Sequence, residues 1–160
     1  MKNLSTLRPR QPSHLARLAC CFALSGLLAV SAHAQTSSMT GNDALYQALG
    51  AKAGLVRLMD DFVPRLFSDP RIGVHFKKTN AQNLKEQLVD QVCMASGGPC
   101  AYKGGDMKSV HADMDITKGD FNALVEALQL AMDAQGIAFT AQNQLLARLA
   151  PMHRDVITVK

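Results

Sequence analysis

The stretch Tyr102-Lys-Gly-Gly-Asp-Met-Lys-Ser-Val-His111 is the most informative part of this chain. It follows a Gly-Gly-Pro turn at residues 97–99 and precedes a helix that we expect to start at Thr117. It carries one histidine on a short helical turn, with no cysteine or second histidine at the spacing of a protein-only metal cage. Such a lone histidine is usually a surface or hydrogen-bonded residue. Its role depends on what the rest of the chain places around it.

The first 34 residues have the composition of a secretory signal peptide. Four basic residues and no acid precede an apolar run from Leu18 to Val30, and Ala32-His33-Ala34 is a small-x-small cleavage signal. We expect Sec-type export, cleavage after Ala34, and a periplasmic or secreted protein without a membrane anchor. Residues 35–41 are small and polar and would form a flexible leader. Residues 42–160 would then form a single domain.

The charge of the mature chain differs from that of the whole sequence. The 160 residues contain 17 Lys and Arg against 13 Asp and Glu. Removal of the signal segment takes away four basic residues and no acid, which leaves 13 of each sign. A nearly neutral protein lacks the electrostatic basis for nucleic-acid binding. We therefore expect no nucleic-acid partner.

Cys93 and Cys100 are the only cysteines after the predicted cleavage site. They flank the Gly-Gly-Pro turn, and in an oxidising compartment such a pair predicts a disulfide. Closing so short a loop would stabilise the fold by roughly 2–3 kcal/mol. Two free buried thiols are the alternative. We expect no lipidation at Cys20, because Arg17 stands where a lipoprotein signal has an apolar residue.

Apolar residues recur at helical spacing through the mature chain, and no strand-like alternation is present, so the predicted fold class is all-α. A helix should begin near Lys52, with Pro64 kinking or locally breaking it. A later helix should begin at Thr117. The predicted inward faces of these two helices are Leu55, Leu58, Met59, Phe62 and Leu66, and Phe121, Leu124, Val125, Leu128 and Met132.

Several helix ends can be predicted from local signals. Thr79-Asn80 should cap the helix that precedes the Gly-Gly-Pro turn. Thr117-Lys-Gly-Asp120 is similar to a capping box with Asp in place of Glu. A last helix should begin at Thr140 or Asn143 and bend at Pro151.

The residues around His111 favour a ligand role. A flat apolar cofactor held through one imidazole needs one nitrogen ligand, apolar walls and a few cations at an edge, and haem is such a cofactor. The apolar side chains that could line this pocket are Met107, Val110, Phe62, Phe76, Leu84, Leu88 and Phe121.

Taken in order, the motifs of this chain resemble those of the group I truncated haemoglobins, which form a two-over-two helical sandwich around a haem. The likeness extends from Ala44 to about Val156. It rests on Leu45-Tyr46, Leu49-Gly50 and Gly54; Asp61-Phe62; Asp69-Pro70 and Phe76; Gly97-Gly98-Pro99; Tyr102-x-Gly104; Met107-Lys108-x-x-His111; Ile116-Thr117-x-x-Asp120-Phe121; and Leu149-Ala150-Pro151.

The resemblance implies a role for each matching residue. His111 would be the proximal ligand to the iron of one haem b per chain. Leu84, Gln87 and Leu88 match distal positions. The residues expected to pack on the macrocycle are Phe76, Phe62, Met107, Val110, Phe121 and Leu124, and the propionate candidates are Lys85 and Lys108.

Two distal positions depart from the family pattern. Group I members usually place a tyrosine after the Asp-Phe pair and a glutamine on the third helix, and both donate hydrogen bonds to bound oxygen. Val63 and Leu88 stand there instead, and neither can donate. Each lost hydrogen bond is typically worth ~1.5–3 kcal/mol, so oxygen retention should fall by a factor on the order of 100 or more. Gln87 is a candidate replacement. His75 is a second one, or a further axial ligand, although a solvent-facing connector position is expected for it.

The predicted function is binding of a diatomic gas, oxygen with NO or CO as further candidates, for oxygen transport or sensing. The alternative is a haem enzyme, a nitric oxide dioxygenase or a peroxidase-like protein. Dioxygenation needs stably held oxygen, so Val63 and Leu88 favour a non-enzymatic role. Loss of haem binding is a third alternative, which His111 and Phe76 disfavour. A reductase would be the protein partner, and the expected state is a monomer or weak dimer.

Overall fold

The computed structural model describes residues 41–159, and they are helical without strands. The predicted signal peptide, its cleavage site and nearly all of the leader lie outside the described residues. Among the described helices, none is long and apolar enough to span a membrane. The elements are α1 (Ala44–Ala48), α2 (Ala51–Ser68), η1 (Gly73–Phe76), α3 (Ala81–Ala95), α4 (Met107–His111), α5 (Lys118–Ala134), α6 (Phe139–Leu149), η2 (Ala150–Met152) and α7 (His153–Val156).

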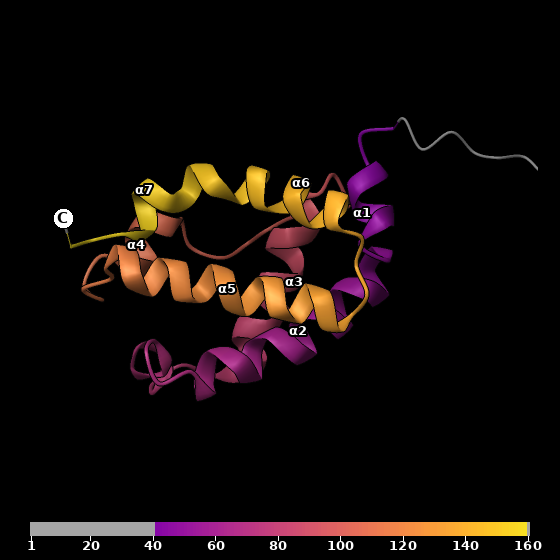
Figure 1. Cartoon of the computed structure of the whole chain (residues 1–160). Helices are drawn as coiled ribbons and strands as arrows, with labels where there is room; N and C mark the ends of the chain where they lie inside the picture. The colour runs from indigo at the N-terminus through magenta and orange to yellow at the C-terminus, as the bar shows by residue number, and fades with distance from the viewer. Residues whose placement is uncertain (1–40, 160) are drawn as a thin grey trace, which may run out of the picture. The chain divides into compact units, whose positions relative to one another are not determined.

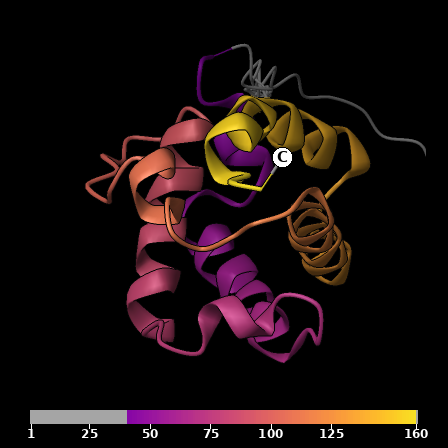
Figure 2. The ribbon, with the colours of Figure 1, turned by 90° about the vertical axis from the view of Figure 1, so that its left-hand side faces the viewer.

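Two antiparallel helix pairs form the body of the domain (Figures 1 and 2). The first pair is α2 and α3, and the second is α5 and α6, joined by a turn at Gly136. α2 packs against both α3 and α5, whereas α6 contacts α1 and α3. The all-α prediction is therefore confirmed. The buried cluster between the helices consists mainly of aliphatic residues: Leu45, Leu49, Leu55, Leu58, Met59, Phe62, Leu66, Ile72, Val89, Val92, Ala123, Ala127, Leu128, Ala131, Met132, Ala141 and Leu145.

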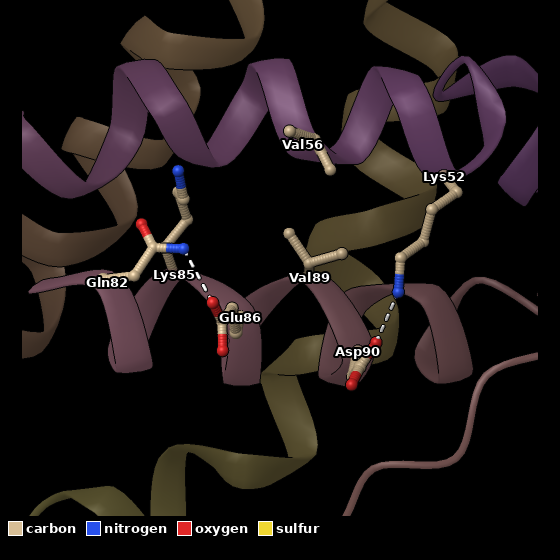
Figure 3. Close-up of a pocket in the computed structure, with 7 residues that line it drawn as sticks. All are labelled: Lys52, Val56, Gln82, Lys85, Glu86, Val89 and Asp90. Atoms are coloured by element: carbon tan, nitrogen blue, oxygen red, sulfur yellow. Dashed lines mark hydrogen bonds and ion pairs between the residues drawn. The ribbon is translucent and has the colours of Figure 1, made fainter.

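The outer edges of α2 and α3 are bridged by charged side chains (Figure 3). The ammonium of Lys52 lies 2.7 Å from the carboxylate of Asp90, and that of Lys85 lies 2.8 Å from Asp60. Between them is a surface groove with a volume of about 320 Å³, whose lining includes Val56. Exposed ion pairs of this kind usually contribute under 1 kcal/mol. They help to set the register of two helices that are held mainly by apolar burial.

The predicted inward face of α2 is confirmed, since its five residues are all at most 3% exposed. Of the kink or local break expected at Pro64, the break is absent, because α2 continues through it to Ser68. Proline removes one N–H, and the apolar face on both sides of it remains buried against α3 and α5. The Ser68 hydroxyl donates to the Pro64 carbonyl at 2.9 Å, one turn before the helix ends at Asp69.

The predicted caps of α3 and α5 are confirmed. The Asn80 side chain accepts the Asn83 N–H at 2.9 Å. In the capping box of α5, Thr117 Oγ1 accepts the Asp120 N–H at 3.2 Å, and Asp120 accepts the Thr117 N–H at 2.9 Å. These hydrogen bonds from Thr117, with a smaller contribution from nearby His75, hold the pKa of Asp120 below its ordinary value of 3.8.

Asp120 should therefore stabilise the fold above its ordinary carboxyl pKa. The unfolded chain takes up this proton first as the pH falls, so the contribution is lost as the pH falls below about 3.8. We expect Asp120→Asn to lower the free energy of unfolding by about 1 kcal/mol at neutral pH, the usual worth of a helix cap. Urea unfolding at pH 7 and pH 3 measures this difference, which should shrink at pH 3. The exposed Asp113→Asn variant is the control, and a pH-independent difference would contradict the prediction.

Of two predictions about the last helices, the start of the helix is wrong and the bend is confirmed. α6 begins at Phe139, with the backbone of Ala138 as its cap, and not at Thr140 or Asn143. The cause is tertiary, since the buried Gln142 donates to the Ile137 carbonyl at 2.9 Å and to Asp133 at 2.8 Å. The bend at Pro151 is confirmed by the 3₁₀ turn η2.

The buried face of α5 is rotated from the predicted one. Leu128 and Met132 are buried as expected, but Phe121, Leu124 and Val125 are only half-buried. The positions that replace them are small residues, which allow α2 to approach closely: Ala123, Ala127 and Ala131.

Candidate functional site

α4 is a five-residue helix that presents His111 at its last position. Asp106 caps it, and its side chain accepts the Ser109 N–H at 3.0 Å and bonds to the Ser109 hydroxyl. Those hydrogen bonds lower the pKa of Asp106. The cap explains why so short a segment is helical at all. It fixes the direction in which α4 leaves the glycine-rich loop.

The imidazole of His111 is oriented by the backbone of its own helix. Its Nδ1 lies 2.7 Å from the carbonyl oxygen of Met107. A carbonyl can only accept, so Nδ1 carries a proton, and in the neutral ring Nε2 keeps its lone pair. A neutral imidazole with a free Nε2 is the form that ligates a metal. The ring is only half-buried, so the core does not enclose the imidazole.

Half-buried apolar side chains from four elements border the core on one side and are partly uncovered on the other. They come from η1, α3, α5 and α6 and from the turn between α5 and α6, and they pack against the buried cluster without joining it. Large apolar side chains left partly uncovered can cover the faces of an apolar ligand. These residues are Phe76, Leu84, Leu88, Leu124, Ile137, Leu146 and Leu149.

The predicted distal residues are divided between the core and this border. Phe62 and Val63 on α2 are 3% and 4% exposed. Leu84 and Leu88, one turn apart on α3, are half-buried. Val63 and Leu88 therefore present only carbon atoms at the two positions where the family usually has hydrogen-bond donors.

Gln87 and His75, the candidate replacement donors, both contact other groups in this structure. The amide oxygen of Gln87 lies where a side chain at Gly104 would have to be, 2.7 Å from an ideal Cβ position. Gln87 thus faces the loop before α4. His75 Nε2 lies 3.7 Å from the carboxylate of Asp120, in the capping box of α5. The expected solvent-facing position of His75 is wrong, since its side chain is 17% exposed.

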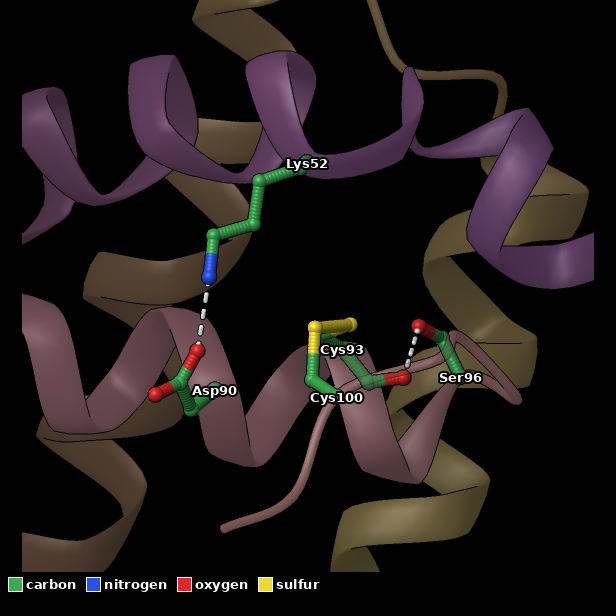
Figure 4. The surroundings of a disulfide bond; sticks show 5 residues. All are labelled: Lys52, Asp90, Cys93, Ser96 and Cys100. Atoms are coloured by element: carbon green, nitrogen blue, oxygen red, sulfur yellow. Dashed lines mark hydrogen bonds and ion pairs between the residues drawn. A yellow bond between two sulfur atoms is a disulfide. The ribbon is translucent and has the colours of Figure 1, made fainter.

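The predicted disulfide between Cys93 and Cys100 is present, with their Cα atoms 5.7 Å apart (Figure 4). It joins the end of α3 to the start of the loop that leads to α4. Between the cysteines, Gly97 has φ +87°, and a Cβ there would collide with the carbonyl oxygen of Asn42. Glycine is thus required at this turn both by conformation and by contact with the residues before α1.

One residue of the site was missed by the sequence analysis. Gln91 on α3 is 9% exposed, and its Nε2 lies 3.4 Å from the sulfur of Met107 and 3.5 Å from that of Met152. The only signal in the sequence was a polar residue between Leu88 and Val92 on a face otherwise predicted to be apolar. From α3, Gln91 thus contacts one residue of α4 and one of η2.

Comparison with protein families decides what kind of domain this is. The family model described as "Bacterial-like globin" matches residues 44–158, which is most of the chain. The chain belongs to the bacterial-like globin family. This globin is therefore a haem protein, and haem-based gas binding is the general activity of its family.

Relatives of this globin are group 1 truncated hemoglobins. It is 29% identical over 114 residues to one from Mycolicibacterium paratuberculosis, covering 71% of this chain and 84% of that protein. It is also 29% identical over 94 residues to one from Tetrahymena thermophila, covering 59% and 78%. The crystal structure of the truncated hemoglobin from Tetrahymena pyriformis, Fe(III) form, has a TM-score of 0.68 at 25% identity, over 71% of this chain and 97% of that one. The recognition of a two-over-two truncated globin is confirmed.

The residues of this globin fit a haem. One imidazole has its Nε2 free, and half-buried apolar side chains such as Phe76 and Leu88 are of the kind that covers a flat apolar group. The described residues contain no cluster of three or more His, Cys, Asp or Glu, so the site is not a protein-only metal cage. Two of the residues expected to pack on the macrocycle have different surroundings. Phe121 stacks edge-on against His153 at 4.8 Å, and Val110 is 47% exposed.

The two propionate candidates also differ in this globin. Lys85 is engaged with Asp60 on α2 at 2.8 Å. Lys108 is exposed on α4, the helix that carries His111. Lys108 thus differs from Lys85 in having no ion-pair partner among the described residues.

Proposed function

We propose that this globin binds a diatomic gas at the iron of a haem b that His111 ligates through Nε2. The observation that carries the proposal is the 2.7 Å contact between Nδ1 of His111 and the Met107 carbonyl, which requires the tautomer used for ligation. Haem would supply an iron that can bind a small gas. The chain supplies the proximal nitrogen, the apolar walls and the distal surroundings.

The distal surroundings select for gases that need no hydrogen bond. Val63 and Leu88 cannot donate, the amide oxygen of Gln87 lies close to Gly104, and His75 Nε2 lies 3.7 Å from the Asp120 carboxylate. Oxygen, which is polarised when it is held by iron, would lose about 1.5–3 kcal/mol for each missing charge-assisted donor. Carbon monoxide and nitric oxide depend less on such donors. Reversible gas binding for transport or sensing fits this site better than oxidation of nitric oxide, which requires firmly held oxygen.

The location and partners of the protein form part of the same proposal. Residues 1–34 have the composition of an export signal, and the Cys93–Cys100 disulfide is of the kind that persists in an oxidising compartment. We place the mature globin in the periplasm or outside the cell. A reductase would keep its iron ferrous, and the expected state is a monomer or weak dimer.

The optical spectrum of the purified protein tests this function. We expect a Soret band and a ferrous spectrum of five-coordinate iron, because Val63 and Leu88 offer no ligand atom and His75 lies beside the Asp120 carboxylate. Adding carbon monoxide should convert it completely to a six-coordinate form. Absence of a Soret band after haem is supplied would refute the proposal. A six-coordinate ferrous spectrum without added gas would refute the distal assignment, and His75→Ala would show whether His75 is the ligand.

A further inference from the structure

Gln91 is a buried amide with unusual partners. Its Nε2 is directed at two thioether sulfurs, Met107 Sδ at 3.4 Å and Met152 Sδ at 3.5 Å. Thioethers are weak acceptors, and burial of a polar amide is unfavourable unless it is hydrogen-bonded. An apolar residue at this position would pack between Leu88 and Val92 without that cost. Core packing alone therefore does not account for an amide at this position.

The partners of Gln91 connect it to His111. α4 has no fully buried residue, and Met107 is the half-buried side chain through which it reaches α3. The carbonyl of the same Met107 accepts the hydrogen bond from Nδ1 of His111. Gln91 thus fixes the side chain of the residue whose backbone orients the imidazole. Met152, on the other side, ties the same amide to the C-terminal segment.

The neighbouring turns of α3 hold the same segment at other points. Cys93 is bonded to Cys100, where the loop begins, and Gln87 contacts the loop at Gly104. Gln91 acts where the loop ends and α4 begins. Of these three α3 side chains, only Gln91 reaches the residue that contacts the imidazole of His111.

We propose that Gln91 is a positioning residue for His111, acting through Met107. The inference rests on the proposed ligation of the haem iron by His111. The hydrogen bond at Nδ1 sets the orientation and basicity of a metal-bound imidazole. A displaced Met107 carbonyl would therefore change the iron–histidine bond while leaving the ligand itself in place.

Gln91→Met tests the proposal, because methionine keeps the length and packing of glutamine and lacks its N–H donors. We expect unchanged haem content, together with a shifted or broadened iron–histidine stretching band in the resonance Raman spectrum of the ferrous protein. Haem transfer to excess apomyoglobin should be about five- to tenfold faster, as expected for the loss of one buried hydrogen bond. Gln82→Met, an exposed change on the same helix, is the matched control and should leave both measurements as in the parent.

A second variant shows whether Gln91 acts through Met107. Met107→Leu removes the sulfur acceptor, so it should shift the same Raman band, and Gln91→Met in that background should add little. If Gln91→Met does not fold, Met107→Leu carries the test alone. An unshifted band in either variant overturns the inference, as do equal and additive shifts from both. Failure of the parent protein to show an iron–histidine band would instead refute the ligation by His111, so the two failures are distinguishable.

Discussion

His111→Ala is expected to reduce haem affinity by at least about 100-fold, since changes to residues that merely support a ligand already cost 10- to 100-fold. The proposed site has a single protein nitrogen, and alanine leaves the iron with no proximal bond. The apolar border can retain some haem by burial alone, so a weak and spectrally altered complex should remain. Titration of the purified protein with haem, followed at the Soret band, measures the loss.

Two controls separate this effect from a general loss of structure. Far-ultraviolet circular dichroism should show that His111→Ala is still helical, because α4 contributes no buried residue to the core. Gln82→Met, an exposed change on α3, is the matched control and should leave the affinity unchanged. Added imidazole should partly restore the spectrum by entering the vacated position. Unchanged haem stoichiometry and affinity in His111→Ala would refute the proximal assignment.

Val63→Tyr is expected to slow oxygen dissociation by about 10- to 100-fold, the equivalent of one restored hydrogen bond to a charged acceptor. Val63 is buried on α2 beside Phe62, on the helix that packs against α3. A phenolic hydroxyl there would supply the donor that the present distal wall lacks. Stopped-flow displacement of oxygen by carbon monoxide gives the dissociation rate.

The larger ring also fills space, so volume has to be separated from hydrogen bonding. Overpacking a buried site commonly costs 1–3 kcal/mol. Val63→Phe introduces nearly the same volume without the hydroxyl and is the matched control. Oxygen dissociation should slow in the tyrosine variant alone, while carbon monoxide dissociation changes little in either. Equal changes in both variants would mean that Val63 does not lie at the bound gas.

Features with local causes could be predicted from the sequence. Asn80 and the pair Thr117 and Asp120 satisfy backbone groups within three residues of themselves, so their caps follow from the sequence alone. The start of α6 could not be predicted, because it depends on Gln142 reaching Asp133 and Ile137 across a turn. The rotation of α5 likewise depends on how closely α2 approaches.

The residues of the site can likewise be divided into those that the sequence identifies and those that it does not. His111 was identified through motifs in family order, and its tautomer follows from the i to i+4 contact with Met107. The partners of Gln91 and His75 lie on other elements, 16 and 45 residues away for Met107 and Asp120. Sequence spacing does not reveal such contacts. Neither residue could therefore be assigned before the fold was known.

The absence of any fully buried residue in α4 has a consequence for assembly. Segments with few buried contacts open at low free energy while the rest of a protein stays folded. We expect α4 to open more readily than the helices of the core, while the disulfide keeps Cys100 at α3. Haem would enter a folded protein through this opening. We therefore expect insertion to be governed by local opening and not by global refolding.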